Sequence, residues 1–174
     1  LKGPRHGGAN RAVRDMMHAV IKEVGLNASD SKIEEVVNRI LDKGFFDRKG
    51  LIYGIGHAVY TKSDPRAILL KEKCGELAKL EGESERFDFY ARFEDISIRE
   101  LKKRKGENTN FCANVDFYSG LTYEILKINA DLFIPIFACA RTVGWLAHNI
   151  ENRLYCDRII RPAAKYVGEI KKNG

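Results

Sequence analysis

The sequence predicts an all-α fold. Apolar residues recur at a helical spacing along most of its 174 residues, strand-like runs are few, and Gly, Ser and Asp-Pro signals separate the periodic segments. Hydrophobic residues make up 44% of the chain, which is enough for a buried core of ordinary domain size. Fifteen Gly and four Pro exclude collagen-like and low-complexity classes.

The first two helices are predicted from apolar stripes that end at glycine. One stripe runs from Ala12 to Val24, and Gly25 follows as a helix-terminating residue. A second covers residues 33–41, with Ser31 and Glu34 at the spacing of a capping box and Gly44 beyond its end. We expect the apolar face of each helix to be buried.

Four further helices follow along the chain. Asp64 and Pro65 open the third, as a capping acid followed by Pro at the first helical position. The fourth covers apolar residues 87–101, the fifth begins near Asp116, and the sixth runs over about residues 132–152. The apolar positions expected on the third helix are Ile68, Leu69, Cys74, Leu77 and Ala78.

Strand and membrane signals are weak. Only residues 51–53 and 158–160 favour strands, and the longest apolar run, residues 132–140, is too short to span a bilayer. No basic-then-apolar signal peptide opens the chain, so we expect a cytoplasmic protein without a membrane partner.

The four cysteines of such a protein are expected to be reduced. They are Cys74, Cys112, Cys139 and Cys156.

The charge is mildly basic, with a formal net charge of +6. This is compatible with nucleic acid and equally with small polyanions such as CoA or dicarboxylates. The densest basic run, residues 102–105, has two interpretations: a solvated helix end, where cations suit the helix dipole, or a phosphate contact. No cysteine pair has zinc or redox spacing, and we expect no metal site.

Three loops between the predicted helices combine glycine or asparagine with groups that can transfer protons. Singly, each has a structural explanation, because a loop imidazole is often structural and an Asp at a helix start is usually a cap. Gly54 and Gly56 also suggest a dinucleotide loop, but Val59 stands in place of a third glycine and no long strand precedes them. The loops are residues 3–10 around His6, 53–60 around His57 and 114–120 around Asp116.

Together, the loops predict an acid–base site. Two histidines and one carboxylate on three separate helix-opening loops form a set suited to proton transfer. Three arginines, Arg66, Arg141 and Arg161, add guanidinium groups that suit carboxylate ligands.

These motifs, taken in order, resemble the citrate synthase family. The resemblance covers nearly the whole chain and predicts a citrate-synthase-like helical small domain with trailing helices of the large domain. The matching segments are Gly-Pro-x-His-Gly-Gly-Ala-Asn at 3–10, Gly-x-Gly-His-Ala-Val-Tyr with Asp-Pro-Arg at 54–66, Asn-Val-Asp-Phe-Tyr-Ser-Gly at 114–120, Ala-Arg-Thr-Val-Gly-Trp-Leu-Ala-His at 140–148, and Arg161-Pro162.

The resemblance implies a role for each matching residue. His6 would hydrogen-bond the acetyl-CoA thioester oxygen and stabilise the enol, and Asp116 would take a proton from the acetyl methyl group. His57 would polarise the oxaloacetate carbonyl. Arg66 and Arg141 would hold oxaloacetate carboxylates. The last of the three arginines, Arg161, would reach the partner subunit's site.

The resemblance also implies CoA contacts. No tightly bound cofactor is expected, since acetyl-CoA is a substrate. Thr61 stands where some family members have a basic residue, and Cys112-Ala113 stands where many have Tyr-Pro. The residues expected to contact CoA are Ile55, Gly56, Ala58, Lys105 and Asn114.

The family pattern divides the chain. Residues 8–127 would be the small, mobile domain, and residues 1–7 and 128–174 would belong to a large domain whose remainder precedes residue 1. We expect this fragment alone to be inactive and the complete enzyme to be a homodimer or higher oligomer with no nucleic-acid partner. Two alternatives stay open: a 2-methylcitrate synthase using propionyl-CoA, and a non-catalytic domain that folds, oligomerises or binds CoA.

Overall fold

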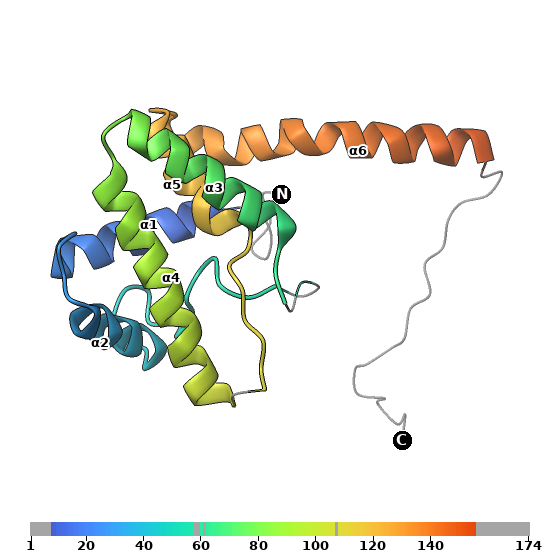
Figure 1. The fold of residues 1–174 in the computed structure, drawn as a ribbon. Coiled ribbons are helices and arrows are strands. Elements are labelled where there is room, and N and C mark those ends of the chain that lie inside the picture. Colours follow the sequence, from blue (N-terminus) through green and yellow to red (C-terminus); the bar gives the residue numbers. More distant parts are fainter. Residues whose placement is uncertain (1–7, 58–59, 61, 107, 156–174) are drawn as a thin grey trace, which may run out of the picture. The chain divides into compact units, whose positions relative to one another are not determined.

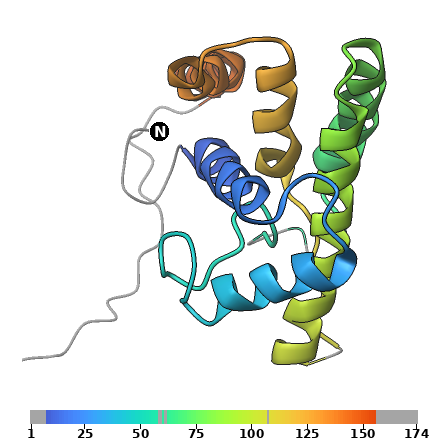
Figure 2. The same ribbon diagram turned by 90° about the vertical axis from the view of Figure 1, so that its left-hand side faces the viewer.

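The all-α prediction is confirmed. The computed structural model describes residues 8–57, 60, 62–106 and 108–155, and within them it contains helices and no strand (Figures 1 and 2). The chain divides into two compact units, Leu1–Phe137 and Ala138–Gly174. The helices are α1 (Ala9–Val24), α2 (Asp30–Leu41), α3 (Pro65–Leu80), α4 (Ser84–Lys105), α5 (Val115–Ile125), the short 3₁₀ helix η1 (Ala130–Leu132) and α6 (Phe133–Tyr155).

The core of the first unit forms around α5. This helix packs against both α1 and α3, while α4 packs against α2 and α3 (Figure 2). Each fully buried large apolar side chain contributes about 1.5–3 kcal/mol to folding. The largest of them are Tyr90, Tyr118, Phe89, Phe93, Phe117, Phe133, Met16, Met17, Ile33 and Ile40.

A close helix crossing fixes α5 against α1. A Cβ added at Gly120 would lie 3.0 Å from the backbone oxygen of Asn10, so a side chain here would push the two helices slightly apart. The middle of α5 is thereby held against the start of α1.

Two local predictions are wrong. The helix α2 begins at Asp30, and Ser29 occupies the N-cap position. The Ser29 side chain forms no capping hydrogen bond with the helix backbone, because its hydroxyl bonds the Ser31 hydroxyl at 2.9 Å. Residues 51–53 form no strand, and the only β-bridge among the described residues pairs Ile55 with Ala113. The predicted strand at 158–160 lies outside the described residues.

The third helix begins as predicted but buries fewer residues than its sequence suggests. Asp64 is its N-cap and Cys74 and Ala78 are buried. However, Ile68 and Leu69 are 57% and 59% exposed. The residues that α3 buries are all small: they are Ala67, Cys74, Gly75 and Ala78.

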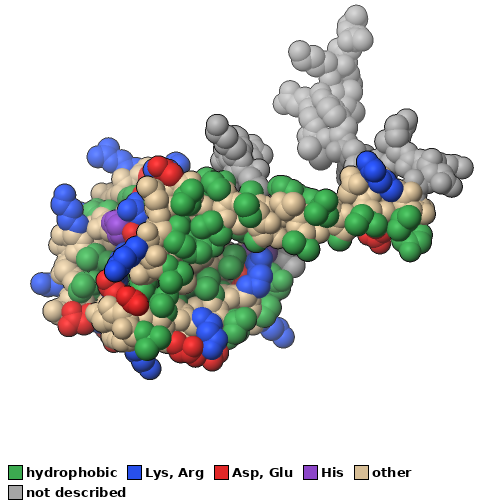
Figure 3. Space-filling view, turned by 90° about the horizontal axis from the view of Figure 1, so that it is seen from above, with side chains coloured by type: hydrophobic (Ala, Val, Ile, Leu, Met, Phe, Trp, Pro, Cys, Tyr) green, Lys and Arg blue, Asp and Glu red, His purple; other side chains and the backbone are tan. Residues whose placement is uncertain are grey.

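Apolar side chains are exposed along α6 (Figure 3). The segment Ala130–Tyr155 is long and apolar enough to cross a membrane by length and composition alone, which is weak evidence for a membrane span. The uninterrupted apolar run of residues 132–140 is too short to meet this criterion, but the whole segment meets it. The exposed large residues are Val143, Trp145, Leu146, Ile150, Leu154 and Tyr155.

Candidate active site

Two of the predicted loops lie side by side. The backbone N–H of Gly56 donates to the Cys112 carbonyl oxygen at 2.7 Å, and that of Asn114 donates to the Gly54 oxygen at 2.8 Å. These two bonds frame the Ile55–Ala113 bridge. The loop that contains His57 is therefore fixed to the segment that opens α5.

Asn114 joins this loop to the first turn of α5. Its side-chain oxygen accepts the N–H of Asp116 at 2.9 Å, and its side-chain nitrogen donates to the Gly56 oxygen at 2.9 Å. Asn114 is the N-cap, so the capping function that an Asp at this point usually serves is already supplied. The half-buried Asp116 carboxylate lies in the first turn of the helix and is not its cap.

Asp64 ties α3 and α5 together at their N-termini. Its buried carboxylate accepts the backbone N–H of Arg66 at 3.0 Å and that of Val115 at 3.2 Å. It also accepts two bonds from the Arg66 side chain, at 2.9 Å from Nε and 2.8 Å from Nη2. The sequence predicts only the cap on α3, because the contact with Val115 depends on the packing of α5.

Arg66 and Asp116 lie within electrostatic reach of each other. The pKa of Arg66 is raised mainly by its side-chain hydrogen bond to Asp64, and the negative charge of Asp116 adds to that rise. Burial raises the pKa of Tyr123, and the charge of Asp116 again adds to it. The guanidinium of Arg66 also lies over the Tyr60 ring, 5.3 Å from its centroid.

His57 is exposed and is oriented by Tyr60. Its Nδ1 accepts the Tyr60 backbone N–H at 3.1 Å, and the two rings lie 4.8 Å apart, centroid to centroid. An accepting Nδ1 assigns the proton of the neutral ring to Nε2. Nε2 is then the hydrogen-bond donor that polarisation of a carbonyl requires.

The structure thus brings six predicted residues into one network. Two further predicted residues, Arg141 and Lys105, are described on other helices, and the rest lie outside the described residues. Arg141 is an exposed residue of α6 in the second unit, and Lys105 is exposed in the last turn of α4. His6, Ala58 and Arg161 lie outside the described residues. The six in the network are Ile55, Gly56, His57, Arg66, Asn114 and Asp116.

The basic run at the end of α4 forms ion pairs. Lys103 contacts Glu100 at 2.6 Å and Glu34 at 3.3 Å, and Arg104 contacts Asp42 at 2.6 Å. These pairs join α4 to α2 and to the residue that ends α2. For Lys103 and Arg104, the structure therefore favours the helix-end interpretation over the phosphate contact.

Replacing Asp64 by Asn should make the stability of the fold depend less on pH in the acidic range. The side-chain hydrogen bond from Arg66, aided by backbone N–H groups and opposed by burial, holds the pKa of Asp64 below its usual value. Because the folded-state pKa is the lower one, ionised Asp64 stabilises the fold above its unfolded pKa. That stabilisation is lost as the pH falls through the folded pKa. We expect the D64N variant to show a smaller drop in Tm than the wild type between about pH 5 and about pH 2.

The control for this titration is Asp88→Asn, because Asp88 is exposed on α4 and forms no ion pair within the described part of the chain. Tm of D88N should follow that of the wild type across the same pH range. If D64N followed the wild-type curve as well, the stabilising role of the ionised Asp64 would be wrong.

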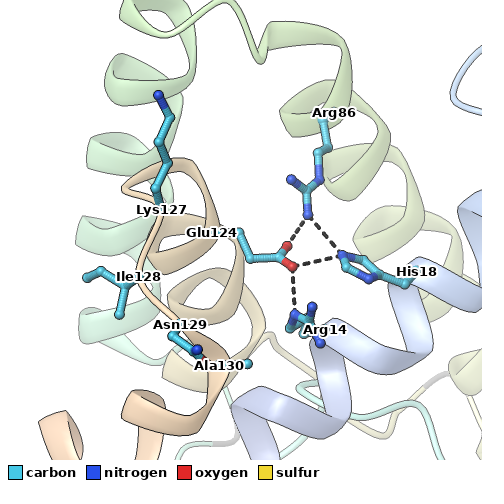
Figure 4. Close-up of a pocket in the computed structure, with 8 residues that line it drawn as sticks. All are labelled: Arg14, His18, Arg86, Glu124, Lys127, Ile128, Asn129 and Ala130. Carbon is cyan, nitrogen blue, oxygen red and sulfur yellow. Dashed lines mark hydrogen bonds and ion pairs between the residues drawn. The ribbon is translucent and has the colours of Figure 1, made fainter.

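A second cluster of charged residues, not predicted from the sequence, surrounds Glu124. This carboxylate, on α5, contacts Arg14 and His18 of α1 and Arg86 of α4 (Figure 4). The only signal in the sequence is the spacing of Arg14 and His18, which places both on one face of α1. Their partners lie far along the chain and could not be assigned without the fold.

Comparison with known proteins extends the match across the chain. The family model described as the C-terminal domain of citrate synthase matches residues 1–163. Citrate synthase 2 of Bacillus subtilis is 42% identical over 172 residues, which cover 99% of this chain and 41% of that protein. A 2-methylcitrate synthase of Shewanella oneidensis is 37% identical over 168 residues, 97% of this chain and 40% of that protein.

Solved structures agree with this match. The citrate synthase of Thermoplasma acidophilum, in a ternary complex with carboxymethyl coenzyme A and oxaloacetate, matches with a TM-score of 0.70 and 28% identity. The match covers 99% of this chain and 42% of that one, so the chain spans about two fifths of the length of its relatives. Because the family model matches residues 1–163, most of this chain, the chain belongs to the citrate synthase family.

Proposed function

We propose that this chain carries catalytic loops of a citrate synthase, which condenses acetyl-CoA with oxaloacetate to give citrate and CoA. The observation that carries the proposal is the position of Asp116 in the first turn of α5. Asn114 caps the helix and Arg66 lies within electrostatic reach of the Asp116 carboxylate. A carboxylate that is not needed as a cap, beside an arginine that suits carboxylate substrates, fits a general base next to its electrophile.

In the proposed reaction, Asp116 removes a proton from the acetyl methyl group. A carbon acid of this kind is too weak for a carboxylate base unless the charge on the thioester oxygen is neutralised as it forms, which is the role we assign to His6. Nε2 of His57 donates to the oxaloacetate carbonyl, with the ring held by the Tyr60 N–H at Nδ1. The enol carbon then attacks that carbonyl, and water hydrolyses citryl-CoA to citrate and CoA.

Arg66 is suited to hold a substrate carboxylate while bound to Asp64. Asp64 occupies the edge formed by Nε and Nη2, which leaves Nη1 on the outer edge of the guanidinium. The side chain is 45% exposed, so that edge is accessible to a ligand. We propose that Arg141 and Arg161 complete this carboxylate site in the assembled protein.

The second candidate is a 2-methylcitrate synthase, favoured by the 37% identity to the Shewanella enzyme. The two activities differ by one methylene of the acyl group, which an apolar pocket distinguishes by only about 1–3 kcal/mol. The acid–base residues would serve either substrate in the same way.

We also propose that the exposed apolar side chains of α6 pack against the part of the protein that the chain does not span. The family match includes this helix, and burying it would remove several large apolar side chains from water. A cytoplasmic homodimer stays our prediction for the assembled enzyme.

The test is CoA release from acetyl-CoA or propionyl-CoA in the presence of oxaloacetate. The protein in its complete length should release CoA, and the acyl-CoA with the higher kcat/KM identifies which synthase it is. Release with neither substrate would contradict the proposed function. We expect the 174-residue chain alone to release none, because most of the length of its relatives lies beyond it; a near-normal rate from it would contradict this expectation.

A further inference from the structure

A hollow lies near the C-terminal end of α5, away from the predicted catalytic residues. It has a volume of about 490 Å³ and opens between the Glu124 cluster and the segment that connects α5 to η1 (Figure 4). Asp116 and Glu124 are eight residues apart on α5, which is about 12 Å along a helix axis. The hollow is lined by Arg14, His18, Arg86, Glu124, Lys127, Ile128, Asn129 and Ala130.

Three basic side chains converge on one carboxylate at the wall of the hollow. The Glu124 carboxylate contacts Arg14 Nε at 2.6 Å and His18 Nε2 at 2.8 Å, and Arg86 reaches its other oxygen. Its side chain is only 12% exposed, and those of Arg86 and Arg14 are 19% and 28% exposed. The guanidinium groups are thus fixed in position and partly removed from water, which strengthens their attraction for an anion.

Positive charge exceeds negative charge among the lining residues. Three basic side chains, Arg14, Arg86 and Lys127, line the hollow together with Glu124, its single carboxylate. Asp15 contacts Arg14 at 2.9 Å from outside the lining and is 46% exposed. Lys127 is exposed and has no acidic partner within the part of the chain that the structure describes.

We propose that this hollow binds an oxyanion group, a phosphate or a carboxylate, of a small ligand. The guanidinium groups of Arg14 and Arg86 would contact the anion from the inner wall of the hollow, and the Lys127 ammonium would contact it from the outer side. The His18 ring lies between the two arginines. Glu124 competes with the ligand for the same donors. Removing the charge of Glu124 should therefore tighten binding, whereas removing a cation should weaken it.

The experiment is a titration of the purified protein with inorganic phosphate and, separately, with malonate, against sodium chloride at matched ionic strength. Binding is measured by calorimetry and by the NMR signals of the His18 ring, which distinguish this hollow from the loop that contains His57. At least one of the two anions should bind and shift the His18 signals. The anion that binds more tightly identifies the group as phosphate or carboxylate.

Three variants test the charge arrangement. Lys127→Gln should weaken binding about threefold, the size expected for an exposed charge. Arg86→Gln should weaken it about tenfold or more, since it removes a charged hydrogen-bond donor. Glu124→Gln should tighten it. Lys127 is exposed and unpaired within the described residues, so its variant keeps the test valid even if Arg86→Gln fails to fold.

The matched control is Lys32→Gln, which removes the same charge from an exposed position on α2, outside the lining. Its affinity should equal that of the wild type. The proposal is overturned if neither anion shifts the His18 signals more than chloride does, or if Lys32→Gln weakens binding as much as Lys127→Gln.

Discussion

Asp116→Asn in the protein of complete length should lower kcat by about 10²- to 10⁴-fold, the usual contribution of a general base. The amide keeps the shape of the side chain but cannot accept the proton at the required step. The bond from the Asp116 backbone N–H to Asn114 does not involve the carboxylate, so the start of α5 should stay intact. Substrate binding should survive, and the KM for oxaloacetate should change much less than kcat.

The control for this kinetic test is again D88N, which removes one carboxylate from an exposed position of α4. It should keep the wild-type kcat, and circular dichroism should show equal helix content in both variants. A fall in kcat of less than about tenfold in D116N would mean that Asp116 is not the base.

Gly54→Ala should destabilise the fold by about 2–5 kcal/mol, the sum of backbone strain and overpacking. Gly54 is buried with a φ of +83°, and an added Cβ would lie 2.8 Å from the Phe117 ring. It would also lie 2.9 Å from a methyl group of Val13. Because Phe117 and Val13 are both fully buried, neither can move aside without disturbing the core. Thermal unfolding should show a drop in Tm of about 5–20 °C.

The matched control is Gly82→Ala, which introduces the same backbone strain without a steric clash of the new Cβ. Gly82 has a similar φ of +74°, but no atom lies within 4 Å of its would-be Cβ. Its variant should therefore lose only about 1–2 kcal/mol, the cost of a left-handed backbone with a side chain. Equal losses of stability in the two variants would show that the contact with Phe117 and Val13 is not the cause.

The helices were predictable because their signals are local. The apolar stripe of α1 and the glycine that ends it lie within one short window, and so do Asp64 and Pro65 at the start of α3. The capping box at Ser31 failed because α2 begins one residue earlier, at Asp30, so Ser31 already lies inside the helix. Glu34 instead contacts Arg99 at 2.7 Å and Lys103 at 3.3 Å. A propensity rule cannot include partners that lie far along the chain.

The same limit applies to the candidate site. Its residue types were predictable from three loops, but which residue caps α5 and which one is left for chemistry was not. Asn114 and Asp116 can both cap a helix, and only the structure shows that Asn114 does so. The second bond of Asp64, to the Val115 N–H, could not be predicted because it requires α3 and α5 to start at the same place.

The pairing of the two loops has a consequence for the order in which the molecule assembles. Asn114 and Gly56 are 58 residues apart, and the two helices between them, α3 and α4, must pack before the two residues can meet. Contacts between distant segments pay a large loop-closure cost and tend to form late in folding. A chain that has formed its helices but not this pairing would contain His57 and Asp116 without a site. During refolding of the protein of complete length, recovery of the proposed activity would then lag behind recovery of helix content.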